Sequence, residues 1–384
     1  MKPTNAVYTG LPTTIFEVMS RLAREHNAIN LGQGFPDTDG PEDVRRAAAE
    51  ALLSSSNQYP PMLGLPALRQ GVADANKRFY GLDVDWQTEV LVTSGATEAL
   101  ADCFSALLEP GDEVIVFEPL YDCYLPLIRR AGGVPRLVRL EPPHWNVDSA
   151  ALAAAFSPRT KAVLLNNPLN PAAKLFSAGE LATLARLIVE HDALAICDEV
   201  YEHIAFDGRA HIPLMTLPGM RERTVRIGSA GKTLSLTGWK VGYVTAPPHL
   251  LEPIAKAHQF TTFTTPPNLQ QAVAFGLSKG DDYYAALISD LTAKRDRLAA
   301  GLTRLGYGVA ESQGTYFLAA DISALSGEDD VAFCRRVTIE AGVTAIPLSA
   351  FYEGDGPRNF IRFCFAKQFG VLDEALARLA AWQR

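Results

Sequence analysis

The stretch IGSAGKTLSLTGWKVGYV, residues 227–244, places Lys232 among small residues between two apolar runs. A lysine near the end of a buried strand costs free energy unless its charge or its amine is used. Three interpretations are open at this point. Lys232 belongs to a phosphate-binding loop, it forms a Schiff base with a cofactor, or it is a surface residue at the end of a strand.

Outward from this stretch, the middle of the chain alternates short apolar runs with helical patterns. Most of the apolar runs end in Gly, Pro, Asn or Asp, as buried strands do. The strand candidates are EVLVTSG (89–95), EVIVFEP (113–119), KAVLLNNP (161–168), LAICDEVY (194–201), TVRIGSAGK (224–232) and VGYVTA (241–246). Between them, residues 96–112 have a helical pattern that stops at a Pro-Gly pair, and residues 177–192 begin with the capping-box pair Ser177 and Glu180. Strands that alternate with helices predict an α/β fold with a mostly parallel sheet covered on both faces.

The pattern changes after about residue 280. Residues 290–306 predict a helix with leucines along one face that ends at Gly306. Two strand-like runs, 314–322 and 359–366, then alternate with two more helical patterns, of which the first covers 330–342. This C-terminal part is typical of a smaller α+β domain.

Composition excludes several classes of protein. The 384 residues are 48% hydrophobic and 20% charged, as in ordinary globular proteins, and the net charge of −8 without a basic run argues against nucleic acid or an anionic membrane as partner. The N-terminal residues have no apolar core of a signal peptide, and no stretch approaches the length of a membrane span. We therefore expect a cytoplasmic protein. The five scattered cysteines, expected to be reduced and to form neither a zinc site nor a disulfide framework, are Cys103, Cys123, Cys197, Cys334 and Cys364.

The phosphate-loop interpretation of Lys232 fails on its context. The pattern G-x-x-x-x-G-K-[ST] needs a glycine five residues before Gly231, where Arg226 stands. The residues after Lys232 also lack the amphipathic helix that such a loop opens. An ATP-binding protein built on this GKT is therefore disfavoured.

The Schiff-base interpretation needs partners for a pyridoxal ring, and the ends of other strand candidates offer them. A carboxylate must keep the ring nitrogen protonated, and Asp198 follows an apolar strand directly. Asn166, Asn167 and Asn170 follow another strand, and each of these motifs alone is also ordinary turn chemistry. TSGATEAL (93–100) exposes backbone N–H groups where a strand becomes a helix, which forms an anion site. Open α/β sheets bind ligands at this edge, so these groups can meet.

In order and spacing, the chain resembles the pyridoxal-phosphate-dependent aminotransferases of class I/II, the fold type I or aspartate aminotransferase superfamily. The branches it resembles most are the methionine and kynurenine aminotransferases. The motifs that carry the resemblance are NLGQGFPD (30–37), NQYPPMLGLPALR (57–69), TSGATEAL, EPLYDCY (118–124), NNPLNP (166–171), CDEVYE (197–202), SAGKTLSLTGWKVGY (229–243) and IRFCFAK (361–367).

The resemblance implies an architecture. It implies a large domain over residues 41–281, with a mostly parallel seven-stranded sheet between helices, which binds pyridoxal 5'-phosphate. It implies that residues 1–40 and 282–384 form an N-terminal arm and a small α+β domain. It also implies a homodimer with shared active sites that acts on amino acids and 2-oxo acids.

The resemblance also implies a role for each matching residue. Lys232 would form the Schiff base and move the proton, Asp198 would pair with the pyridine nitrogen, and Asn170 and Tyr201 would hold the phenolic oxygen. Arg362 would bind the substrate α-carboxylate in a bidentate manner, helped by Gly34 and Asn170. The remaining cofactor contacts would be Tyr121, which stacks on the ring, Gly95, Ala96, Ser229 and Lys240 at the phosphate, and Tyr59 from a second subunit. The side-chain pocket would be lined by Ile15, Phe351 and the partner's Phe263.

Two departures and one alternative remain. Lys240 stands where many relatives have arginine, and Ala172-Ala173 follows NNPLNP where Thr-Gly is usual. No second arginine in a matched motif meets a distal carboxylate, so we expect donors such as methionine, an aromatic amino acid, kynurenine or glutamine. A β-lyase acting on cysteine S-conjugates would use the same site and stays open. A binding module without chemistry is disfavoured because the whole set of reactive residues is present.

Overall fold

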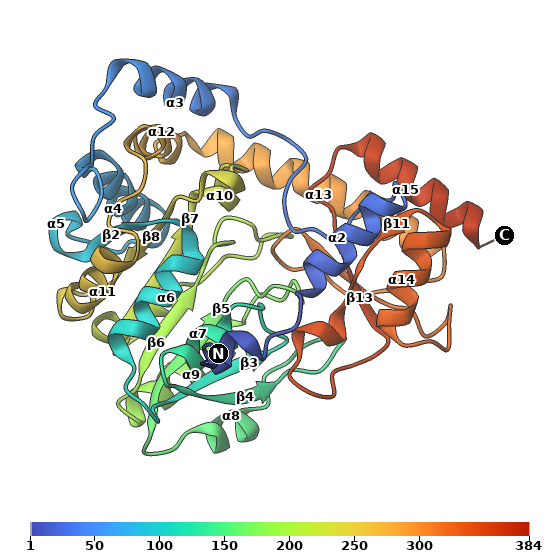
Figure 1. The fold of residues 1–384 in the computed structure, drawn as a ribbon, viewed down its shortest axis with the longest axis horizontal. Helices are drawn as coiled ribbons and strands as arrows, with labels where there is room; N and C mark the ends of the chain where they lie inside the picture. Colours follow the sequence, from blue (N-terminus) through green and yellow to red (C-terminus); the bar gives the residue numbers. More distant parts are fainter. Residues whose placement is uncertain (1, 384) are drawn as a thin grey trace.

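The computed structural model describes residues 2–383, and its centre is a twisted seven-stranded sheet (Figure 1). Strand β8 runs antiparallel to its two neighbours and the other neighbouring pairs are parallel, so the expected mostly parallel sheet is confirmed. In spatial order the strands are β2 (Val90–Thr93), β8 (Gly242–Thr245), β7 (Thr224–Ser229), β6 (Leu194–Asp198), β5 (Thr160–Asn166), β3 (Glu113–Glu118) and β4 (Val134–Arg139).

Helices cover both faces of this sheet because alternate residues of each strand point to opposite sides. In β3, Val114 and Val116 belong to one apolar core and Ile115 and Phe117 to another. The first core is closed by α6 (Gly95–Leu107), α7 (Tyr124–Arg130) and α11 (Pro248–Thr261), and the second by α8 (Ser149–Ala155) and α9 (Ala178–Glu190). The capping box expected at Ser177 and Glu180 is present at the start of α9.

A third apolar cluster lies at the β2 end of the sheet, where α12 packs against α3 and α4. The helices of this end are α3 (Glu42–Ser54), α4 (Pro66–Tyr80), α5 (Trp86–Glu89), α10 (Ala230–Thr233) and α12 (Pro267–Leu277).

The C-terminal part forms a second, smaller layer of strands and helices (Figure 1). Its four-stranded sheet is antiparallel, in the order β12 (Ile346–Pro347), β13 (Phe360–Cys364), β10 (Phe317–Asp321) and β9 (Gly308–Val309). Around it pack α13 (Asp281–Arg304), α14 (Asp330–Glu340) and α15 (Phe369–Trp382). The helix expected over 330–342 thus ends two residues early, before Gly342.

The N-terminal segment joins this second part. It contains α1 (Ala6–Thr9), α2 (Ile15–Glu25) and β1 (Ile29–Asn30), and β1 pairs in parallel with β11 (Val343–Thr344). The proposed domain boundaries at 40/41 and 281/282 stay a prediction. Over residues 2–383, no helix has the length and apolar character needed to cross a membrane.

Candidate active site

A cavity of about 380 Å³ opens at the carboxyl ends of β5, β6 and β7, between the large sheet and the C-terminal part. Parallel strands end at one edge, so residues that are far apart in the chain meet there. The cavity is lined by eleven of the fifteen residues expected in the site, namely Gly34, Gly95, Ala96, Tyr121, Asn170, Asp198, Tyr201, Ser229, Lys232, Lys240 and Arg362.

Lys232 lies in α10, the short helix that directly follows β7. Its ammonium group lies 5.6 Å from the ring centroid of Tyr201 and 5.7 Å from that of Tyr316. Burial lowers the pKa of Lys232 to about 8, although the negative charge of Asp198 opposes the shift. About a tenth of this amine is therefore neutral at pH 7, far more than for an ordinary lysine, as a nucleophilic lysine requires. The interpretation of a surface lysine is wrong.

Asp198 ends β6 and is buried. The hydroxyl of Tyr124 donates to its Oδ2 at 2.6 Å, and the backbone N–H of Val200 reaches Oδ1 at 3.4 Å. Burial nevertheless raises the pKa of this carboxyl group, while Tyr124 and Lys232 act in the opposite direction. A buried acid of this kind is suited to pair with a protonated ring nitrogen, which would keep it ionised.

Arg362 lies in β13 and is 1% exposed. Its Nη1 donates to Oδ1 of Asn170 at 2.8 Å and its Nη2 donates to the carbonyl of Gly32 at 2.6 Å, while its Nε is buried without a partner. Phe317 lies under the guanidinium, 4.0 Å from its centre to the ring centroid. Both acceptors are neutral, and burial lowers the pKa of Arg362 to about 10. The site therefore offers a positive charge that a carboxylate would neutralise.

The N-terminus of α6 forms the anion end of the cavity, where Gly95, Ala96 and Thr97 line it. Gly95 has φ +78°, and a Cβ there would lie 3.3 Å from Nζ of Lys240. A Cβ at Gly242 would lie 2.6 Å from the carbonyl carbon of Gly95, so only glycine lets β8 approach this turn. Helix N–H groups and the Lys240 ammonium thus converge on one point, as a phosphate site requires.

Together these groups fit pyridoxal phosphate. The cavity contains an anion site, an amine of lowered pKa, a buried carboxyl group and the ring of Tyr121, all in one space. Arg362 adds a positive charge to the same lining.

Four expected residues do not line the cavity of this chain. Tyr59 is 82% exposed and Phe263 is 38% exposed, and their rings contact each other edge to face at 5.4 Å on the surface. Their action across a subunit interface stays a prediction. In place of Ile15, the next residue, Phe16, lines the cavity, because successive helical side chains point about 100° apart. Phe351 is buried behind Phe16, 5.7 Å from it between ring centroids.

Sequence reasoning missed several residues of the site. Tyr124 is the most informative, because it lies in the quoted motif EPLYDCY three residues after Tyr121, and this spacing near a helix start could have indicated a shared face. Asp122 in the same motif also lines the cavity. The other lining residues, to which the sequence assigned no specific role, are Thr14, Phe16, Gln33, Thr97, Leu100, Asn166, Val200, Gly231, Thr237 and Phe317.

Comparison with known proteins assigns the family. Residues 26–379 match the model of aminotransferase class I and II. The chain belongs to the class I and II aminotransferases. A solved structure of YbdL from Escherichia coli, identified as a methionine aminotransferase, has a TM-score of 0.96 at 43% identity and covers 99% of this chain and 100% of its own. The fold type I architecture is thereby confirmed.

Two relatives of this aminotransferase are named for different substrates. The probable N-succinyldiaminopimelate aminotransferase DapC of Mycobacterium tuberculosis is 44% identical over 379 residues, 96% of each chain. Kynurenine–oxoglutarate transaminase 3 of Mus musculus is 37% identical over 403 residues, 97% of this chain and 89% of its own. Enzymes of this family depend on pyridoxal 5'-phosphate, so the expected cofactor and enzyme class are confirmed.

Proposed function

We propose that this aminotransferase takes the amino group of an apolar or aromatic L-amino acid, such as methionine, an aromatic amino acid, kynurenine or glutamine, and passes it to a 2-oxo acid. The observation that carries the proposal is that Arg362 is the one arginine among those residues of 2–383 that line the cavity. The other two cations of the lining, Lys232 and Lys240, are assigned to the cofactor. A substrate with one carboxylate is therefore matched, and among the described lining residues a distal carboxylate finds no second arginine.

The rest of the substrate side is suited to an uncharged side chain. Phe16 and Phe317 line the cavity next to Arg362, with ring centroids 5.3 and 4.0 Å from the guanidinium carbon. Asp122 adds an acidic group to the same lining. Burial raises the pKa of Asp122, and to the extent that this group is ionised it repels a second carboxylate on the substrate.

Each of the proposed site residues then has a defined role. Pyridoxal phosphate, when bound, supplies an aldehyde for the amino group and a ring that withdraws electrons from the substrate Cα. Lys232 would hold the cofactor, and its amine would take the proton from the substrate Cα as general base and deliver it to C4′ of the cofactor as general acid. Asp198 keeps the ring nitrogen protonated, and Asn170 and Tyr201 hold the phenolic oxygen. The two half-reactions run in turn, as in ping-pong kinetics.

Exposed aromatic side chains support the proposed homodimer. Tyr59, Phe260 and Phe263 are large apolar residues at the surface, and Phe260 is 85% exposed. Such groups favour burial against a partner. In the proposed dimer, Tyr59 and Phe263 enter the site of the second subunit.

A substrate screen tests the proposal. Purified enzyme loaded with pyridoxal phosphate is given methionine, phenylalanine, kynurenine, glutamine, aspartate or N-succinyldiaminopimelate, the substrate class named for the M. tuberculosis relative, with several 2-oxo acids as acceptors. We expect kcat/KM for the first four donors to exceed that for the two with extra carboxylates at least tenfold. A clear preference for aspartate or N-succinyldiaminopimelate would overturn the proposed substrate class. Pyruvate release from a cysteine S-conjugate without an acceptor would identify the β-lyase instead.

A further inference from the structure

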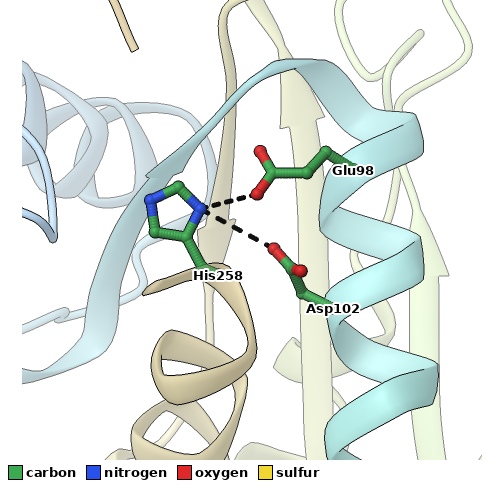
Figure 2. A group of neighbouring side chains, drawn as sticks. All are labelled: Glu98, Asp102 and His258. Atoms are coloured by element: carbon green, nitrogen blue, oxygen red, sulfur yellow. Dashed lines mark hydrogen bonds and ion pairs between the residues drawn. The ribbon is translucent and has the colours of Figure 1, made fainter. Parts of the chain in front are cut away.

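A buried cluster of three ionisable side chains joins α6 to α11, outside the cavity (Figure 2). Glu98 and Asp102 stand one turn apart on α6 and point toward His258 in the last turn of α11. Nδ1 of His258 lies 2.6 Å from Oε1 of Glu98 and 3.7 Å from Oδ2 of Asp102. His258 and Asp102 are fully buried. Burial of charged groups away from water costs free energy unless each charge is paired or neutralised by a proton.

The surroundings indicate where the protons are. Neither oxygen of Asp102 accepts a hydrogen bond, which a buried carboxylate would require. Burial and the neighbouring Glu98 raise the pKa of Asp102 to about 9, so it is neutral at pH 7. Burial acts to raise the pKa of Glu98 too, but the neighbouring His258 and Asp102 side chains lower it overall. Glu98 is thus the anion of the cluster, and Nδ1 of His258 is hydrogen-bonded to it.

Three such ligand types could also bind a metal ion, but the spacing opposes this. Ligands of a tetrahedral zinc ion stand about 2.0–2.2 Å from the metal, which places them about 3.4 Å from one another. The 2.6 Å between Nδ1 of His258 and Oε1 of Glu98 is a hydrogen-bond distance. A proton, not a metal, lies between these two atoms.

The cluster connects two segments that matter for the site. On one side, the second oxygen of Glu98 accepts the backbone N–H of Ser94, the residue before the α6 turn that lines the cavity. On the other side, the carbonyl of His258 accepts the backbone N–H groups of Thr262 at 3.0 Å and Phe263 at 2.9 Å. The hydrogen bond between Glu98 and His258 therefore joins the anion-binding turn to the segment that carries Phe263.

We propose that Glu98, Asp102 and His258 are positioning residues that hold the phosphate-binding turn of α6 against the end of α11. The inference rests on the proposed site, since it takes the α6 end of the cavity as the phosphate site. Its consequence is selective: the cluster contributes to the affinity for the phosphate of the cofactor and not to that for the ring. If the cluster only stabilised the fold, its loss would weaken binding of the phosphate and binding of the ring equally.

The test measures dissociation constants of the cofactor-free enzyme for pyridoxal 5'-phosphate and for pyridoxal, which lacks the phosphate. His258→Leu and Glu98→Ala remove the connection. We expect each to weaken binding of pyridoxal phosphate at least tenfold and binding of pyridoxal less than twofold. His258→Asn retains a donor near the Nδ1 position and Asp102→Asn retains a neutral donor, so both are expected to stay within threefold of the parent enzyme. Glu252→Gln, on the exposed side of α11, is the matched control and changes neither constant.

Several results would overturn the inference. They are equal losses for both ligands, unchanged binding of pyridoxal phosphate in Glu98→Ala, or a metal ion bound one to one that is lost in His258→Leu. Should His258→Leu not fold, Glu98→Ala and the two conservative variants still decide. Failure of the proposed substrate class is distinguishable, because an enzyme that prefers aspartate would show the same selective loss of phosphate affinity.

Discussion

The phenolic hydroxyl of Tyr124 donates a 2.6 Å hydrogen bond to Oδ2 of Asp198, the carboxyl group assigned to the ring nitrogen of the cofactor. The two side chains come from α7 and from the end of β6, and both are buried. A hydrogen bond to an ionised group contributes about 1.5–3 kcal/mol. Tyr124 therefore stabilises the charged form of Asp198.

Removing this donor is expected to slow transamination. In Tyr124→Phe, the Asp198 carboxylate loses its hydrogen bond, its pKa rises, and it pairs less well with a protonated ring. We expect kcat to fall about tenfold while the thermal midpoint of the loaded enzyme changes little. Steady-state kinetics with methionine measure the effect, and an unchanged kcat would show that Asp198 needs no such support.

The lowered pKa of Lys232 predicts a pH dependence for cofactor uptake. Only the neutral amine attacks an aldehyde, so the rate should rise about tenfold per pH unit below the pKa and level off above about pH 8. An ordinary lysine would keep gaining reactivity up to about pH 10.4. Stopped-flow absorbance of cofactor-free enzyme mixed with pyridoxal phosphate measures this profile, and Lys232→Ala is the control that must show no covalent uptake.

Arg362 is expected to govern affinity for the amino acid. Arg362→Lys retains the charge but loses the planar pair of donors, and one of the contacts to Asn170 or Gly32 must break. We expect KM for the amino donor to rise about a hundredfold, with cofactor binding unchanged. A small change in KM together with a large loss of cofactor would place Arg362 at the phosphate instead.

Ala173 predicts a stabilising substitution. It has φ +57° and is 1% exposed, and its carbonyl accepts the N–H groups of Gln313 at 2.8 Å and Gly314 at 3.1 Å. The left-handed conformation costs an alanine about 1–2 kcal/mol, of which the extra freedom of glycine in the unfolded chain offsets a part. Ala173→Gly should raise the free energy of unfolding by about 0.5–1 kcal/mol.

Urea unfolding of the cofactor-free enzyme measures the effect of Ala173→Gly. Ala172→Gly is the matched control, because Ala172 is equally buried but does not have a positive φ. It should lower stability. Equal effects of the two substitutions would contradict the role of backbone strain.

Much of the large sheet was predictable because its strands are buried on both faces and read as apolar runs. The strand that the pattern missed is β4, Val134–Arg139, at the edge of the sheet. Only Val138 of this edge strand is buried, and the strand carries a proline and two arginines and lacks the apolar run. The motif order likewise predicted the residues at strand ends that line the cavity.

Orientation was harder to predict than position. Phe16 and not Ile15 lines the cavity. Which of the two side chains faces it depends on the residue at which α2 begins, and that residue is Ile15. The partner of Asp198 was missed because Tyr124 is 74 residues away in the chain, and no local pattern reports such a contact. The cluster of Glu98, Asp102 and His258 was invisible for the same reason, since α6 and α11 meet only in the folded chain.

The carbonyl of Gly32, which holds one arm of Arg362, lies 330 positions away along the polypeptide. The support of Arg362, the proposed substrate anchor, thus depends on the packing of the N-terminal segment against β13, whereas the residues proposed to hold the cofactor in this subunit all lie between Gly95 and Lys240. During folding, formation of the cofactor site and formation of the substrate site are therefore separable. The substrate site forms only after the N-terminal and C-terminal segments of the chain have packed together.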